Sequence, residues 1–209
     1  MAMRLHELHP SLSHFPIALL PVSVGCDICG VWMDNDNYLT VGRMTMPMMA
    51  ASAAVALASG VLAQEEIIAD DEGASMLKTH RTLNMASLAV TSSMAVYRLR
   101  RRRPSWTYLT IGVGATAMIV YSAYLGGKMV YQKGMGVEDA NGVLLSQSPE
   151  LVPGNGKRIL SAIKEQLVNG IRKNIRDLFS SGEVAESEEI QRAIGTEVGS
   201  DEPEVGVRQ

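Results

Sequence analysis

The chain has 209 residues, of which 46% are hydrophobic, and a formal net charge of −3. This charge gives no electrostatic case for nucleic-acid binding, and two cysteines are too few for a disulfide framework. Two phenylalanines and two tryptophans argue against a large soluble aromatic core. Apolar residues gather before about residue 131 and charged residues after it, which favours a membrane region followed by an extramembrane region.

Four apolar segments precede residue 131, and each is close to the ~20 residues that a helix needs to cross a bilayer. They must be helical, because lipid offers no partner for an open strand edge. The third is shorter and more polar, and could begin at His80. We expect the spans at Phe15–Met33, Met44–Ala63, Leu83–Leu99 and Trp106–Leu125. "SVGC" (23–26) faintly resembles a lipoprotein cleavage site, but we interpret the first segment as an uncleaved span.

Orientation depends on "RLRRRRPSW" (98–106), which places five arginines between the third and fourth spans. The positive-inside rule predicts that the Arg-rich 98–103 loop is cytoplasmic. The N-terminus, the 64–81 link and the C-terminus then lie outside. We therefore expect a multi-pass protein of the bacterial plasma (inner) membrane. Asp27, inside the first span, is expected to face a polar partner that the sequence does not identify.

The remaining chain is expected to be extramembrane. Residues 138–156 are rich in turn formers and are predicted to be a linker. Residues 157–181 are predicted to form an amphipathic helix that contacts a lipid surface or a partner, because six aliphatic residues recur at helical spacing and five basic residues occupy the other faces. Residues 182–209 are predicted to be an acidic, flexible tail. The predicted fold class is all-α: a four-helix transmembrane bundle (1–137) with this helix and tail.

The four histidines would all lie near the outer membrane face. His6, His9 and His14 precede or open the first span, and His80 opens the third. Single histidines often lie among lipid headgroups, but ionisable groups from two helices favour a functional site. His9 and His14 would point about 140° apart on one helix, so they cannot easily chelate one small ion. A haem instead needs one imidazole from each of two facing helices, and His14 with His80 meets that requirement.

Neighbouring residues fit such a site. Asn84, Ser87 and Thr91 share a helix face with His80, and a polar face in a spanning helix must turn inward. Tyr124 and Lys128 lie at the outer end of the fourth span. Lys128 would either pair with a haem propionate or extend toward the headgroups.

Two stretches, "HPSLSHFPIAL" and "AYLGGKMVYQKGMGV" (123–137), resemble the signature stretches of a bacterial membrane family catalogued as domain of unknown function 2231. The resemblance covers roughly residues 6–137. That family is grouped with two-haem membrane cytochromes of the cytochrome b-561 and formate dehydrogenase gamma type. The resemblance thus implies haem b and transmembrane electron transfer through His9, His14 and His80. Many relatives carry a further histidine late in the fourth span, where this chain has Tyr124, Gln132 and Lys133, so a second haem would require His6.

Three functions follow as hypotheses. The first is a haem b electron-transfer subunit that links the quinone pool to a membrane or periplasmic redox protein. The second is a cofactor-free subunit that anchors a larger membrane complex. The third is an outer-face zinc or copper site that uses His14, His80 and His9. An electron-transfer or accessory subunit is favoured over a self-contained enzyme, because two axial histidines leave no open position on an iron.

Overall fold

The computed structural model describes residues 3–143, 151–152 and 154–197, with the side chains of residues 138 and 178–197 excepted. The chain divides into two compact units, Met1–Leu167 and Val168–Gln209. Within the described residues the structure is helical and contains no strand, which confirms the predicted all-α class.

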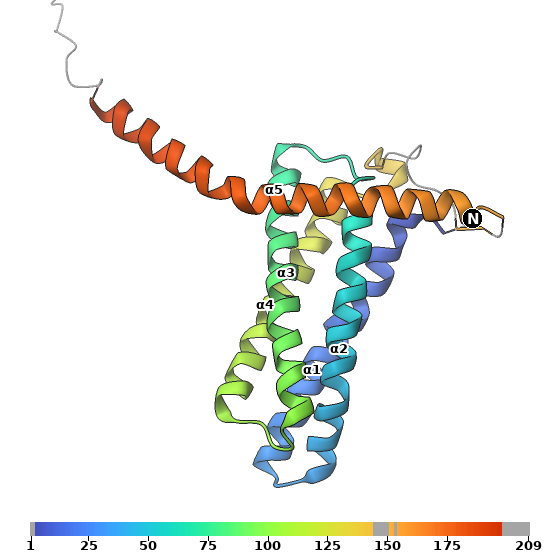
Figure 1. Ribbon diagram of the computed structural model, residues 1–209, viewed down its shortest axis with the longest axis vertical. Coiled ribbons are helices and arrows are strands. Elements are labelled where there is room, and N and C mark those ends of the chain that lie inside the picture. The colour runs from blue at the N-terminus through green and yellow to red at the C-terminus, as the bar shows by residue number, and fades with distance from the viewer. Residues whose placement is uncertain (1–2, 144–150, 153, 198–209) are drawn as a thin grey trace, which may run out of the picture. The chain divides into compact units, whose positions relative to one another are not determined.

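Four long helices dominate the first unit: α1 (Leu8–Trp32), α2 (Asp36–Ala63), α3 (Asp71–Arg100) and α4 (Trp106–Lys133). They lie side by side and alternate in direction (Figure 1). A short 3-10 helix, η1 (Leu5–Glu7), precedes α1, and η2 (Glu138–Ala140) follows α4. Two links, 33–35 and 101–105, meet at one end of the bundle, here called the arginine end. The start of α1, the link 64–70 and the end of α4 form the other, here called the histidine end.

Local capping fixes where these helices begin. The Asn35 side chain accepts from the N–H of Asn37 at the start of α2. Asp70 accepts from the N–H of Gly73 at 2.6 Å before α3, and Ser105 caps α4. Helix α4 ends at Gly134, whose φ of 64° is the left-handed conformation that glycine adopts without strain. The boundaries thus follow short polar signals as well as hydropathy.

Among the residues that the structure describes, three helical stretches are long and apolar enough to cross a membrane: Leu5–Trp32, Asp36–Ala63 and Trp106–Lys133. They cover the expected second and fourth spans in full and the expected first span except for Met33, and each is longer than the span it covers. Helix α3 is not among them, because its central part is less apolar and includes Asn84, Ser87 and Thr91. It has 30 residues, however, and is therefore as long as its neighbours.

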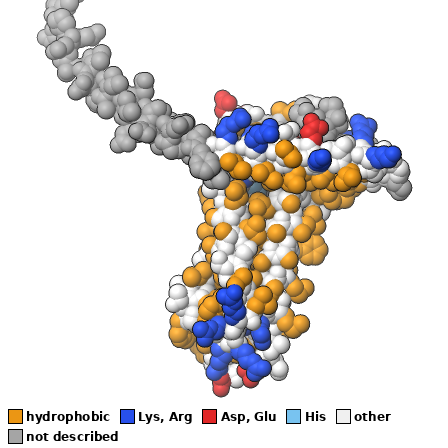
Figure 2. All heavy atoms as spheres, in the orientation of Figure 1, with side chains coloured by type: hydrophobic (Ala, Val, Ile, Leu, Met, Phe, Trp, Pro, Cys, Tyr) orange, Lys and Arg blue, Asp and Glu red, His pale blue; other side chains and the backbone are white. Residues whose placement is uncertain are grey.

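The surface of the bundle supports a membrane environment. The core is built from a small set of buried residues: Leu20, Val24, Met46, Met49, Met94, Ala95, Tyr108, Leu109, Ala115 and Ile119. Many equally large apolar side chains point outward, and Figure 2 shows them along the length of the helices. Trp32 and Trp106 are exposed at the arginine end, and Tyr131 is exposed at the histidine end of α4. Aromatic residues at both ends of an apolar surface are typical of membrane–water interfaces.

Helix α5 (Gly156–Glu197) contains the predicted amphipathic segment and continues past residue 181, where that segment was expected to end. Residues 198–209 of the predicted tail lie outside the described residues. In the first unit, Gln166 Nε2 donates to Glu66 Oε1 at 2.7 Å, and the N–H of Leu151 donates to the carbonyl of Met3 at 2.8 Å. The first turns of α5 are therefore held at the histidine end.

An ion-pair cluster at the histidine end gives a pH prediction. Lys133 Nζ contacts the carboxylates of Asp70, at 3.2 Å, and Glu72. The N–H of Gly73 and then the Lys133 ammonium hold the pKa of Asp70 below its usual range. The ionised Asp70 carboxylate therefore stabilises the folded state fully above its unfolded pKa of about 3.9, and this stabilisation is lost as the pH falls through the lower folded pKa. Acidification below about pH 4 should lower the melting temperature less in Lys133→Gln than in the wild type.

The control is Lys128→Gln, which removes the same charge five residues earlier on α4. Melting of the detergent-solubilised protein, followed by circular dichroism between pH 7 and pH 3, provides the measurement. An equal drop in melting temperature in Lys133→Gln and the wild type would contradict the assignment.

Candidate functional site

The histidine end holds a pair of rings from two helices, His9 on α1 and His80 on α3. Their ring centroids are 6.2 Å apart and their planes lie at 84° to each other. In the bundle, α1 packs most against α2, and α3 packs against both α2 and α4. The two rings therefore meet from helices that are not consecutive in the chain. Both side chains are only partly buried.

The backbone of α2 orients His9. Its Nδ1 lies 2.9 Å from the carbonyl oxygen of Ala56, and Ser59 Oγ lies 3.4 Å from the same nitrogen. A carbonyl oxygen can only accept, so Nδ1 carries the proton. In the neutral ring, Nε2 then holds the lone pair.

The backbone of α4 orients His80 in the same way. Its Nδ1 lies 2.8 Å from the carbonyl oxygen of Ser122 and 3.0 Å from Ser122 Oγ. That hydroxyl donates to Asn84 Oδ1 at 2.8 Å, and Asn84 Nδ2 donates to His80 Nε2 at 2.9 Å. Asn84 therefore covers the lone pair that His80 would offer to a metal.

These contacts place the proton of both imidazoles on Nδ1, which is the tautomer that binds a metal through Nε2. A ligating histidine usually donates its other N–H to a carbonyl or carboxylate, which fixes the ring and its tautomer. Bonds of about 2.0–2.1 Å from two nitrogens to one ion, extended to the ring centres, correspond to a centroid separation of roughly 6 Å. The 6.2 Å observed between the ring centroids of His9 and His80 is close to that separation. Asn84 Nδ2 would have to leave His80 Nε2 before that nitrogen could bind an ion.

Two glycines make room for the rings. A Cβ on Gly60 of α2 would lie 3.0 Å from His9 Cε1, and one on Gly126 of α4 would lie 3.3 Å from His80 Cε1. Both contacts are tighter than most Cβ contacts. The rings can therefore reach the neighbouring backbones because these positions have no side chain.

The other candidate residues lie apart from this pair. His14 is exposed, and its Nδ1 lies 2.7 Å from the carbonyl of Pro10 on its own helix. His6 is buried, with Nδ1 3.5 Å from Glu66 Oε2. Tyr124 is exposed and stacks on Tyr121. Lys128 is half-buried on α4. The structure thus brings together His9, His80 and Asn84, whereas the ring contact expected of His14 is made by His9.

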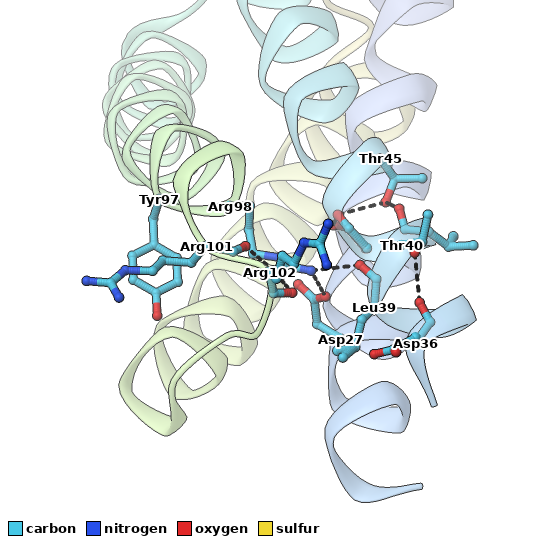
Figure 3. Close-up of polar contacts among 12 residues, drawn as sticks. Asp27, Asp36, Leu39, Thr40, Thr45, Tyr97, Arg98, Arg101 and Arg102 are labelled. Atoms are coloured by element: carbon cyan, nitrogen blue, oxygen red, sulfur yellow. Dashed lines mark hydrogen bonds and ion pairs between the residues drawn. The ribbon is translucent and has the colours of Figure 1, made fainter. Parts of the chain in front are cut away.

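A second polar cluster lies near the arginine end (Figure 3). Arg98 of α3 is fully buried, and its Nη2 donates to Asp27 Oδ1 of α1 and to the carbonyl of Leu39 of α2, both at 2.8 Å. Its Nη1 donates to the carbonyls of Arg101 and Arg102 at 2.8 Å each. This Arg98 cluster joins α1, α2, α3 and the α3–α4 link.

The Arg98 cluster supplies the polar partner expected for Asp27. A Cβ on Gly42 would overlap Asp27 Oδ1, so the carboxylate reaches Arg98 across a glycine of α2. Arg98 is one of the five arginines that suggested a cytoplasmic loop, yet it is fully buried. The remaining four, Arg100–Arg103, are exposed and still form a basic link.

Sequence reasoning did not find several contributing residues. The His9 and His80 rings are contacted by two serines and two glycines, Ser59, Ser122, Gly60 and Gly126. In the sequence these are only small residues within apolar helices, and nothing else marks them as part of a site. Glu66 is fully buried between His6 and Gln166, and no sequence pattern distinguished it from the other acidic residues of its link. Among the described residues, no group of three or more His, Cys, Asp or Glu side chains is arranged to hold a metal ion.

These features define a helical membrane protein with apolar outer surfaces and two internal polar clusters. The family model described as "Predicted membrane protein (DUF2231)" matches residues 5–139. The chain therefore belongs to the DUF2231 family of membrane proteins. No curated protein and no solved structure matches it.

Proposed function

We propose that this protein is a membrane electron-transfer subunit that binds one haem b through His9 and His80. The observation that supports the proposal most directly is the 6.2 Å separation of two imidazoles whose Nδ1 atoms are both engaged by backbone carbonyls. That arrangement makes Nε2 the ligand atom of His9, and also of His80 once Asn84 has released it. When bound, haem b supplies reversible one-electron transfer.

The protein's own groups would set the ligand field. The Ala56 and Ser122 carbonyls hold the two Nδ1 protons and raise the basicity of the imidazoles. The Ser122 hydroxyl donates to Asn84 Oδ1 and would keep this amide beside the His80 ring after it releases Nε2. Because His9 and His80 would both hold the iron, no site would remain open for a small substrate, which would favour electron transfer over catalysis.

We also propose that α3 is the fourth span. It is antiparallel to its neighbours, equally long, and it directs Ser87, Thr91 and Arg98 to the interior, where all three are buried. Polar residues that face inward are compatible with a spanning helix. The basic link Arg100–Arg103 would then be cytoplasmic, and the histidine pair would lie near the outer face of the plasma membrane. From there, electrons would pass between membrane quinone and an external redox protein.

An absorbance experiment tests the proposal. The protein purified in mild detergent should show a sharp Soret band that shifts on reduction with dithionite. A pyridine haemochrome assay with protein quantitation should give about one haem b per chain. A preparation with bound zinc or copper and no Soret band would instead support a metal site, and one with neither would support an anchoring subunit.

A further inference from the structure

Helix α5 has an exposed apolar face. Its Leu160, Val168, Ile171 and Ile175 side chains are between 46% and 69% exposed. At about 100° per residue, these four positions fall within roughly 80° of one another around the helix axis. Exposed aliphatic residues confined to one arc indicate a contact surface, because scattered ones would be expected on a merely solvated helix.

Basic residues border this arc. Between residues 157 and 176, exposed basic residues outnumber acidic ones. The basic residues are Lys157, Arg158, Lys164, Arg172, Lys173 and Arg176, and the acidic residue is Glu165. The three arginines lie roughly 40–80° beyond the edge of the apolar arc. Lys157 and Lys164 lie on the arc itself, where long aliphatic stems can cover apolar surface while the ammonium reaches a polar layer. Figure 2 shows a row of apolar side chains along α5 with basic side chains beside it.

The start of α5 lies at the level where the apolar helices end. Gln166 is bonded to Glu66, three residues past the end of α2. Leu151 is bonded to Met3, just before the apolar stretch Leu5–Trp32 begins. The first turns of α5 are thus attached where the bundle would leave the bilayer.

We propose that α5 lies on the bilayer surface, with its apolar arc (Leu160, Val168, Ile171 and Ile175) in the acyl boundary and its three arginines on anionic phospholipid headgroups. An apolar face bordered by cationic residues is typical of interfacial helices, and basic residues are attracted by the negative potential of anionic lipid. The attachment of α5 beside the span ends favours lipid over a soluble protein partner, since lipid is the neighbour present on every side of the bundle.

Site-directed fluorescence on the full chain tests this proposal. In a Cys26→Ser/Cys29→Ser background, Ile171→Cys and Asn169→Cys would each be labelled with bimane. Asn169 is exposed and lies about 140° from the middle of the arc, so it serves as the matched control. Each protein would be reconstituted in nanodiscs of phosphatidylcholine, with or without 30% phosphatidylglycerol, that carry a shallow doxyl-labelled lipid.

We expect at least about twofold stronger doxyl quenching at Ile171 than at Asn169, and stronger quenching at Ile171 when phosphatidylglycerol is present. The Arg158→Gln/Arg172→Gln/Arg176→Gln variant should remove the dependence on phosphatidylglycerol. Equal quenching at the two positions would overturn the proposal. So would an Ile171 label that is shielded from the doxyl lipid and whose emission changes with the number of chains per nanodisc, because that result would assign the arc to a second copy.

Discussion

The Asp27→Leu variant is expected to lose about 3–5 kcal/mol of folding free energy, which is the usual effect of removing one partner from a buried ion pair. Both Asp27 and Arg98 are fully buried, so the guanidinium that remains would keep its charge without a counterion or water. Its three carbonyl partners satisfy hydrogen bonds but do not neutralise it. Thermal unfolding in detergent, followed by circular dichroism, should show a melting temperature well below that of the wild type.

The exposed pair Asp34–Arg103 supplies the matched control, since it joins the same residue types at the same end of the bundle. The change of Asp34 to Asn, which tolerates the positive φ of this position, should cost at most about 1 kcal/mol, because exposed ion pairs contribute little. The double variant Asp27→Leu/Arg98→Met should recover part of the loss by removing the isolated charge. It should not recover all of it, because the carbonyls of Leu39, Arg101 and Arg102 would lose their donor. An Asp27→Leu protein as stable as Asp34→Asn would show that the buried Asp27–Arg98 pair does not stabilise the fold.

The helices could be predicted from the sequence because a bilayer-length apolar run has few alternatives. Their ends could not be predicted from hydropathy. Helix α1 begins at Leu8, well before Phe15, because the polar residues His9 and Ser11 can adopt a helix and Pro10 lies in the first turn, where its missing N–H has no helical partner. Helix boundaries depend on capping and backbone hydrogen bonds, whereas the predicted spans depended on side-chain transfer free energy.

The identity of the paired rings could be predicted only in part. His80 and Asn84 were expected to face inward together, and they do. On the first span, the five-residue separation of His9 and His14 implied that only one of them could face the bundle interior. Which one faces inward depends on the rotation of α1 about its axis. That rotation is decided by close packing, such as the contact of the His9 ring with Gly60, and not by spacing along one helix.

The Arg98 cluster could not be predicted from the sequence, for a different reason. Asp27 and Arg98 are 71 residues apart, and Arg98 stands in a run of arginines whose other members are exposed. A charge in such a run is ordinarily solvated, so the pattern indicated orientation rather than a buried contact. Arg98 differs from the other four arginines in its position along the helix. Arg98 lies two residues before the end of α3, where it still contacts Asp27 of α1 and Leu39 of α2.

The second large effect concerns the proposed haem ligands. His9→Ala and His80→Ala should each lose the Soret band and the haem measured by pyridine haemochrome, because one imidazole cannot provide both axial bonds. His14→Ala should retain close to one haem per chain. His14 is the matched control because it is also a histidine of α1 with Nδ1 engaged by a carbonyl, yet its ring is exposed and lies outside the pair.

Two further readouts separate ligand loss from unfolding. Each variant should keep the circular dichroism and melting behaviour of a folded bundle, since the rings are only partly buried. Added imidazole should restore a Soret band in His9→Ala or His80→Ala if the cavity left by the ring admits it. The reverse pattern, with haem lost in His14→Ala and retained in His9→Ala, would assign the axial bond to His14 and require α1 to turn by more than a quarter of a rotation about its axis.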